Sequence, residues 1–382
     1  MSRFLAVLLL MVLAWPLPGP AHAPAGRPAS QPRDSYLLLV NTAIAFMMDE
    51  AKLRQFDRSP YDGIAIAFAH AYETAEVPSV QAMDAKLEEW KRYTKKDIWP
   101  WVYLNRVIAF NPGENNEHAK VSYFQRIRGA DLDNGAGARA EFLALWRNSL
   151  LAARHSGAPG VVFDPEFYNS YKQYDIGELA RNSGSTPAKV ATQLQQLGAE
   201  MADSAGEAYP DATVWFLVTG FTHPGYKTLD GVPYYPSPTY VAIGFLDEIA
   251  KRRLQLKVLS GGEGSLGYCH PSLEELRNAI ADRDAAFRPI LEKYRGTLAL
   301  AGTMTLWSDK AATRNWVNEG ACKAATAESV EQLQPYLELL LRTYRYNWVY
   351  GSSDGNYLPF SPQSAPRFDS MIARARAHGA TR

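Results

Sequence analysis

Short runs of apolar, β-branched and aromatic residues recur along this chain, and a stretch with helical periodicity separates each run from the next. Strands and helices that alternate in this way are typical of parallel sheets built from βα units. We expect strands at residues 36–41, 63–70, 98–105, 160–164, 213–220, 255–260, 297–306 and 346–351. We expect helices at residues 45–56, 79–93, 138–155, 187–208, 238–253, 272–294, 329–344 and 368–377. Eight such units in succession predict an α/β fold, a (β/α)8 or TIM barrel with right-handed crossovers.

The turns and connections favour this barrel over an open, doubly wound sheet. No Gly-x-Gly-x-x-Gly turn follows any predicted strand, although dinucleotide-binding open sheets carry one after their first strand. Two connections are long, at residues 106–138 and 221–237, and long loops in compact domains often bind ligands. The sequence therefore predicts one barrel domain with extended βα loops.

The first 33 residues differ from the rest in composition. Arg3, an apolar run over residues 4–15 and the pattern Ala21-His22-Ala23 are typical of an export signal with its cleavage site. A retained membrane anchor is the alternative, but the run is shorter than the ~20 residues that a span needs, and prolines follow it. We expect a signal peptide at residues 1–23, a flexible lead at 24–33 and the catalytic barrel at 34–382. The mature protein is then exported, to the periplasm or the medium, without a stable membrane span.

Composition narrows the class of partner. Lys and Arg together number 40, as do Asp and Glu, and no cationic stripe stands out, which argues against nucleic acid as a partner. The 12% aromatic content provides flat rings suited to the faces of sugars as well as to a core. We therefore expect a carbohydrate partner and no cofactor. The cysteines are Cys269 and Cys322, which either form a disulfide, as exported proteins allow, or remain as two thiols.

Two carboxylates at the end of the fourth predicted strand are the candidate catalytic residues. Side chains alternate along a strand, so Asp164 and Glu166 share the face of Val162, while Phe163 and Pro165 point the other way. Proline donates no ladder hydrogen bond, so the strand should leave the sheet at this point. The two acids therefore belong at a carboxyl-terminal strand tip, where barrel enzymes keep their chemistry.

The ends of the other predicted strands would face the same cavity and supply further candidates. For a second carboxylate these are Glu263, in a glycine-rich turn, and Asp354, which also fits a simple turn residue. The candidates for substrate binding are amide, cationic and aromatic side chains: Asn105, Arg106, Tyr168, His223, Tyr72, Trp307 and Trp348. Such a set suits cleavage of glycosidic bonds, which needs one carboxylic acid to protonate the leaving oxygen and one carboxylate to assist.

At this strand end the chain resembles the glycoside hydrolase barrels. The segment from Phe163 to Tyr168 is similar to the end of the D-x-x-D-x-D-x-E signature of family 18 chitinases, whose two earlier acids correspond to Pro159 and Val162 here. The resemblance implies that Glu166 is the general acid and that Asp164 orients an acetamido group. It also implies that Trp348 is the tryptophan these enzymes place on strand eight.

A second template and two other classes of function remain open. The α-galactosidase-like barrels place a nucleophile at strand four and an acid at strand six, which would pair Asp164 or Glu166 with Glu263. A metal-dependent hydrolase or polysaccharide deacetylase would use His223, His270 and Asp354, although the first strand lacks the H-x-H pair of amidohydrolases. A non-catalytic carbohydrate-binding barrel is the third reading, since fold alone does not certify activity.

Overall fold

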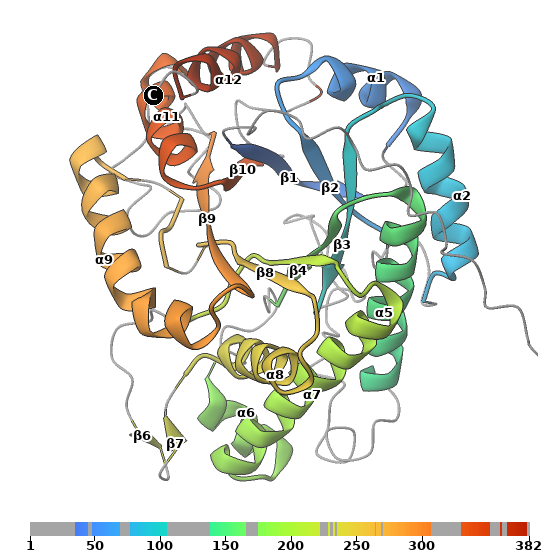
Figure 1. Cartoon of the computed structure of the whole chain (residues 1–382), viewed down its shortest axis with the longest axis vertical. Coiled ribbons are helices and arrows are strands. Elements are labelled where there is room, and N and C mark those ends of the chain that lie inside the picture. The colour runs from blue at the N-terminus through green and yellow to red at the C-terminus, as the bar shows by residue number, and fades with distance from the viewer. Residues whose placement is uncertain are drawn as a thin grey trace, which may run out of the picture. The chain divides into compact units, whose positions relative to one another are not determined.

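The structure is a computed structural model, and it contains the predicted barrel (Figure 1). It describes residues 35–44, 48–68, 77–104, 138–165, 175–221, 228–229, 232–233, 235–263, 265–268, 270–306, 330–351, 360 and 365–379. Eight parallel strands close in the order β1-β10-β9-β8-β5-β4-β3-β2. They are β1 (Tyr36–Ile44), β2 (Gly63–Ala67), β3 (Asp97–Tyr103), β4 (Gly160–Asp164), β5 (Thr213–Phe216), β8 (Lys257–Ser260), β9 (Leu298–Thr305) and β10 (Tyr346–Gly351). The predicted fold class is confirmed.

Helices follow the strands in chain order and surround the barrel (Figure 1). They are α1 (Glu50–Arg58), α2 (Val80–Lys91), α5 (Ala138–Ser156), α7 (Pro187–Ala208), α8 (Ser237–Arg252), α9 (Leu273–Lys293), α11 (Gln334–Thr343) and α12 (Ala365–Gly379). Side chains of Asp49, Ser79, Thr186 and Ser272 cap four of these helices by accepting a backbone N–H from the first turn. Within the described residues, no helix is long and apolar enough to cross a membrane.

The structure differs from the predicted elements in three places. The first helix begins at Glu50 rather than at residue 45, because Asp49 caps it there. Helix α6 (Ile176–Ser183) was not predicted; Asp175 caps its first turn, and the helix ends at Gly184 with φ 63°. A two-stranded hairpin, β6 (Thr228–Leu229) and β7 (Val232–Pro233), lies in the predicted excursion at 221–237.

The two faces of each strand bury two separate sets of side chains. On β4, Val161 and Phe163 belong to the large core between strands and helices, whereas Val162 belongs to the cluster inside the barrel. That interior cluster contains the four tryptophans Trp99, Trp101, Trp215 and Trp348. The predicted alternation along β4 is therefore confirmed, and part of the high aromatic content fills the barrel.

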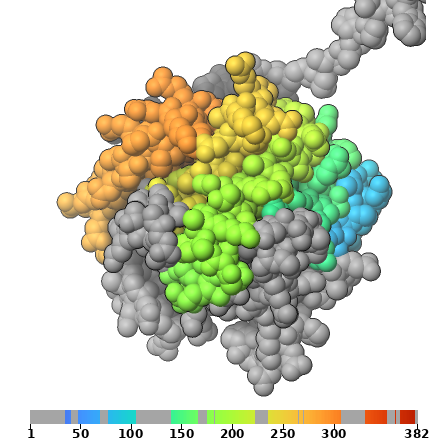
Figure 2. Space-filling model, turned by 90° about the horizontal axis from the view of Figure 1, so that it is seen from below, coloured from blue at the N-terminus to red at the C-terminus, as the bar shows by residue number. Residues whose placement is uncertain are grey.

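Close helix packing brings α7 and α8 together on the outside. A β-carbon on Gly198 would lie 2.0 Å from the carbonyl oxygen of Val241, and one on Gly244 would lie 1.9 Å from that of Gln195. Only glycine lets the two backbones approach this closely. In Figure 2, the colours on one face of the molecule run from blue through green and yellow to orange, so segments that follow one another in the chain lie side by side there.

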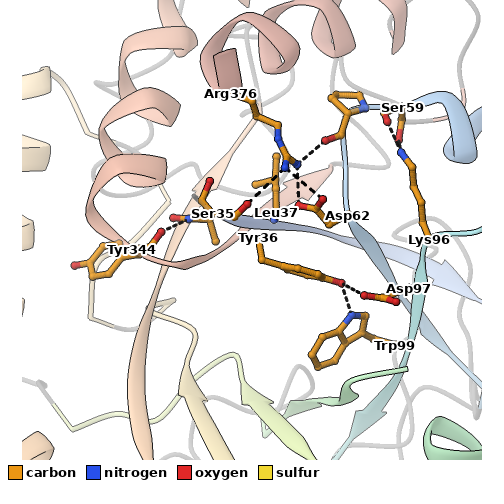
Figure 3. A network of polar contacts seen from close by, with 12 residues as sticks. Ser35, Tyr36, Leu37, Ser59, Asp62, Lys96, Asp97, Trp99, Tyr344 and Arg376 are labelled. Atoms are coloured by element: carbon orange, nitrogen blue, oxygen red, sulfur yellow. Dashed lines mark hydrogen bonds and ion pairs between the residues drawn. The ribbon is translucent and has the colours of Figure 1, made fainter. Parts of the chain in front are cut away.

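A polar network closes the amino-terminal end of the barrel (Figure 3). The Tyr36 hydroxyl donates to Asp97 Oδ2 at 3.0 Å and accepts from Trp99 Nε1 at 2.8 Å. Burial and the neighbouring Asp97 carboxylate raise the pKa of Tyr36 well above its usual range, so the phenol stays protonated. Beside it, the Arg376 guanidinium of α12 binds both carboxylate oxygens of Asp62, at 2.8 and 3.3 Å.

Arg376→Met is expected to lower the free energy of unfolding by about 2–3 kcal/mol, because the arginine donates charge-assisted hydrogen bonds that methionine cannot replace. Besides Asp62, its acceptors are the carbonyl oxygens of Pro60, at 2.8 Å, and Ser35, at 3.5 Å. Urea denaturation measures the change. Arg374→Met is the matched control, since Arg374 is exposed on the same helix and should shift stability by less than about 0.5 kcal/mol. Equal effects of the two changes would contradict this account of the network.

Candidate functional site

The end of β4 places a buried carboxylate at the carboxyl-terminal end of the barrel interior. The strand ends at Asp164, as Pro165 predicts, and Asp164 lies on the same face as the interior residue Val162. Asp164 is in register with Tyr103 of β3, and its carbonyl oxygen accepts the Leu104 N–H at 2.8 Å. Its exposed fraction is 0%. Burying a carboxylate is costly, and acidic groups kept in such places are candidates for function.

The turn after β8 brings Glu263 to the same end. The Gly261 N–H donates to Phe216 O at 2.6 Å, and the Glu263 N–H donates to Leu217 O at 3.3 Å, so the turn rests on the end of β5. Gly262 has φ 90°, a conformation that favours glycine. Its carbonyl oxygen accepts the Leu266 N–H at 2.7 Å, which tightens the turn. Glu263 is partly exposed, as a rim carboxylate must be to reach a substrate.

Aromatic rings gather beside this turn. The Trp348 indole N–H donates to Gly261 O at 2.7 Å, and the ring is 1% exposed. Tyr268, at the end of the turn, packs edge-on against Trp348 with ring centroids 5.6 Å apart and lies 5.8 Å from the ring of Tyr350. Tyr268 is partly exposed and covers the buried tryptophan. Sequence reasoning missed Tyr268, because no strand or spacing pattern marks its position.

A second aromatic pair lies beside Asp164. The rings of Trp101 and Tyr103, on the interior face of β3, stack with centroids 4.5 Å apart. The Trp101 indole N–H and the hydroxyls of Thr303 and Thr305 are buried and have no hydrogen-bond partner within the described part of the chain. Both threonines share the interior face with Ala301. The barrel interior thus combines flat rings, hydrogen-bonding groups and a carboxylate.

Most of the other predicted site residues lie outside the part of the chain that the structure describes. Glu166, Asp354 and the export signal at 1–23 lie outside the described residues. The same holds for the predicted binding residues Asn105, Arg106, Tyr168, His223, Tyr72 and Trp307 and for both cysteines, Cys269 and Cys322. Among the described residues, Asp164 ends β4, Glu263 lies in the turn after β8, and Trp348 contacts that turn through Gly261.

The described residues do not support the alternative of a metal-dependent hydrolase. Among them, no group of three or more His, Cys, Asp and Glu side chains is arranged to hold a metal ion. His270 is the one histidine of the predicted metal set that the structure describes, and burial lowers the pKa of its imidazole. His270 lies near the end of the β8–α9 connection, just before α9.

Comparison with known proteins establishes the fold. No family model and no curated protein matches the sequence. Endoglycoceramidase II from Rhodococcus sp. superposes with a TM-score of 0.51 at 12% identity, covering 88% of this chain and 78% of that chain. The GH18 chitinase ChiB from Flavobacterium johnsoniae gives 0.42 at 9% identity, covering 90% and 94% of the two chains. The catalytic domain of β-amylase from Paenibacillus polymyxa gives 0.44 at 10% identity, covering 90% and 99%.

The likeness to endoglycoceramidase II shows the barrel fold alone. Identities of 9–12% carry it no further. A shared fold does not determine activity, which depends on the residues of the site.

Proposed function

We propose that this protein is a glycoside hydrolase that cleaves O-glycosyl bonds in a poly- or oligosaccharide by carboxylate acid/base chemistry. The observation that carries the proposal is the buried carboxylate of Asp164 on the interior face at the carboxyl-terminal end of β4. In parallel barrels that end of the strands holds the active site. The rings of Trp101 and Tyr103 lie beside this carboxylate, and the buried hydroxyls of Thr303 and Thr305 share the barrel interior with it.

The roles follow from what glycosidic cleavage requires. Glu166 is proposed as the general acid that protonates the leaving oxygen, with Asp164 as its electrostatic partner or as the nucleophile. Glu263, at the turn after β8, and Asp354 are candidates for the second carboxylate. Carboxyl groups about 5–5.5 Å apart would give retention of configuration, and those about 6.5–9.5 Å apart would give inversion.

The decisive experiment is a screen of soluble and insoluble glycans with the wild type beside Glu166→Gln. The change keeps the shape of the side chain but removes its proton, so we expect turnover of any cleaved glycan to fall by about 10²–10⁴-fold. The unfolding midpoint should stay near that of the wild type, because glutamine has nearly the same size and shape as glutamate. Product release by reducing-end assay and thermal denaturation are measured on the same preparations.

Each outcome of this screen is informative. Full turnover by Glu166→Gln would rule out Glu166 as the general acid. Binding of a glycan by the wild type without cleavage would instead favour the non-catalytic carbohydrate-binding barrel. Activity lost on chelation and restored by a divalent cation would favour the metal-dependent hydrolase.

A further inference from the structure

Arg283 of α9 is a buried cation with an unusual set of partners. Its exposed fraction is 1%, and its guanidinium donates to two carbonyl oxygens, Ser260 O at 2.9 Å and Ala301 O at 2.8 Å. The guanidinium carbon lies 5.3 Å from the ring centroid of Tyr344 and 5.5 Å from that of Phe287. No carboxylate of the described residues forms an ion pair with it. A buried charge held by carbonyls and rings is costly to keep, which points to a specific role.

The two carbonyl oxygens mark the place where neighbouring strands separate. The last pair of the β8–β9 ladder is Ser260 with Leu300, and Arg283 bridges β8 and β9 at Ser260 and at Ala301, one residue further along β9. A β-carbon on Gly262 would lie 3.2 Å from the guanidinium carbon, so the arginine packs directly against the turn. The planar fork of arginine suits two fixed carbonyl acceptors better than a lysine ammonium does.

The other end of this turn is also fixed, from inside the barrel. The Trp348 indole holds Gly261 O, and the Thr305 N–H donates to Tyr268 O at 3.2 Å. The turn is therefore held by Arg283 on its helix side and by Trp348 and Thr305 on the interior side. Glu263 lies between these attachments.

We infer that Arg283 is a positioning residue that fixes the turn Gly261–Tyr268, and through it Glu263 and Tyr268, at the carboxyl-terminal rim of the barrel. The guanidinium links β8 to β9 beyond the last pair of their ladder, where backbone hydrogen bonds between the two strands have ended. Gly262 can then turn the chain away from β9. The consequence for catalysis rests on the proposed function, whereas the consequence for the turn does not.

Hydrogen exchange tests the structural part. Arg283→Met keeps most of the side-chain volume but removes every donor. We expect the amides of Glu263, Ser265 and Leu266 to exchange about tenfold faster, with exchange in α7 and α8 unchanged. Arg288→Met is the matched control, because Arg288 is exposed on the same helix. It should leave exchange unchanged both in the turn and in α7 and α8. Unchanged protection of the turn in a folded variant, or an equal loss over the whole molecule, would overturn the inference. Arg283→Lys serves for the same measurement if the methionine variant does not fold.

Kinetics on a glycan identified by the screen test the catalytic part. A displaced Glu263 should lower kcat by about 10- to 100-fold with KM nearly unchanged, since misplacement by a fraction of an ångström already weakens catalysis. A loosened turn with unchanged kcat would overturn the link to Glu263. If the wild type cleaves no glycan, the proposed function fails, and hydrogen exchange alone still decides the positioning role.

Discussion

Asp164→Asn is expected to lower glycosidic turnover by about 10²–10⁴-fold while the free energy of unfolding changes by less than about 1 kcal/mol. Asn keeps the shape of the side chain and can still form hydrogen bonds, but it cannot carry the negative charge that the proposed chemistry uses. Asp164 is fully buried, so removing its charge also removes a desolvation cost. Steady-state kinetics and urea denaturation on the same preparation measure the two effects.

Asp97→Asn is the matched control for this prediction. Asp97 is also an aspartate on the interior face of a strand, but it lies at the start of β3, where its carboxylate accepts the Tyr36 hydroxyl. We expect this change to alter stability and to leave turnover unchanged. If Asp164→Asn instead lowers the free energy of unfolding by about 3–5 kcal/mol with turnover intact, Asp164 is one partner of a structural ion pair.

Gly160→Ala is expected to have the largest effect on stability, lowering the free energy of unfolding by more than about 4 kcal/mol. A β-carbon at this position would lie 1.8 Å from the carbonyl oxygen of Thr213 and 2.7 Å from its carbonyl carbon. Those atoms belong to the backbone of β5, which is paired in register with β4, so no side-chain rotation relieves the clash. Urea denaturation, or the soluble yield where the variant does not fold, measures the loss.

Gly379→Ala is its control. There the nearest atom to an added β-carbon is the Leu341 β-carbon at 3.5 Å, an ordinary contact, so stability should change by less than about 1 kcal/mol. If the Gly160→Ala protein is as stable as this control, the close pairing of Gly160 with Thr213 described above is wrong.

The fold could be predicted from the sequence because its signals are local. Alternation along a strand put Val162 and Asp164 on one face, and Pro165 marked where β4 ends. Both follow from local backbone geometry: side chains alternate along any strand, and proline has no N–H to donate in any sheet. Helix α6 was missed although it has local signals of the same kind, since Asp175 caps its first turn and Gly184, with φ 63°, ends it.

The support of the candidate site could not be predicted, because it depends on contacts between distant residues. Arg283 reaches the β8 turn from the middle of a helix, and the Trp348 indole bonds to Gly261 across a separation of 87 residues. In the sequence, Arg283 is one charged residue on an amphipathic helix among several. Nothing short of the folded arrangement shows that it faces two carbonyl oxygens and that Tyr268 covers a tryptophan.

The closure of the barrel has a consequence for how the chain can be made. Strand β1 pairs with β2 on one side and with β10 on the other, and Arg376 then binds Asp62 across 314 residues of sequence. Until residues 346–351 have been synthesised, β1 and the growing end of the sheet both expose unpaired backbone groups, which invite pairing with other chains. A chain that folded before residues 346–351 were made would be an open sheet with two unpaired edges, and covering those edges would favour closure of the barrel over pairing with other chains.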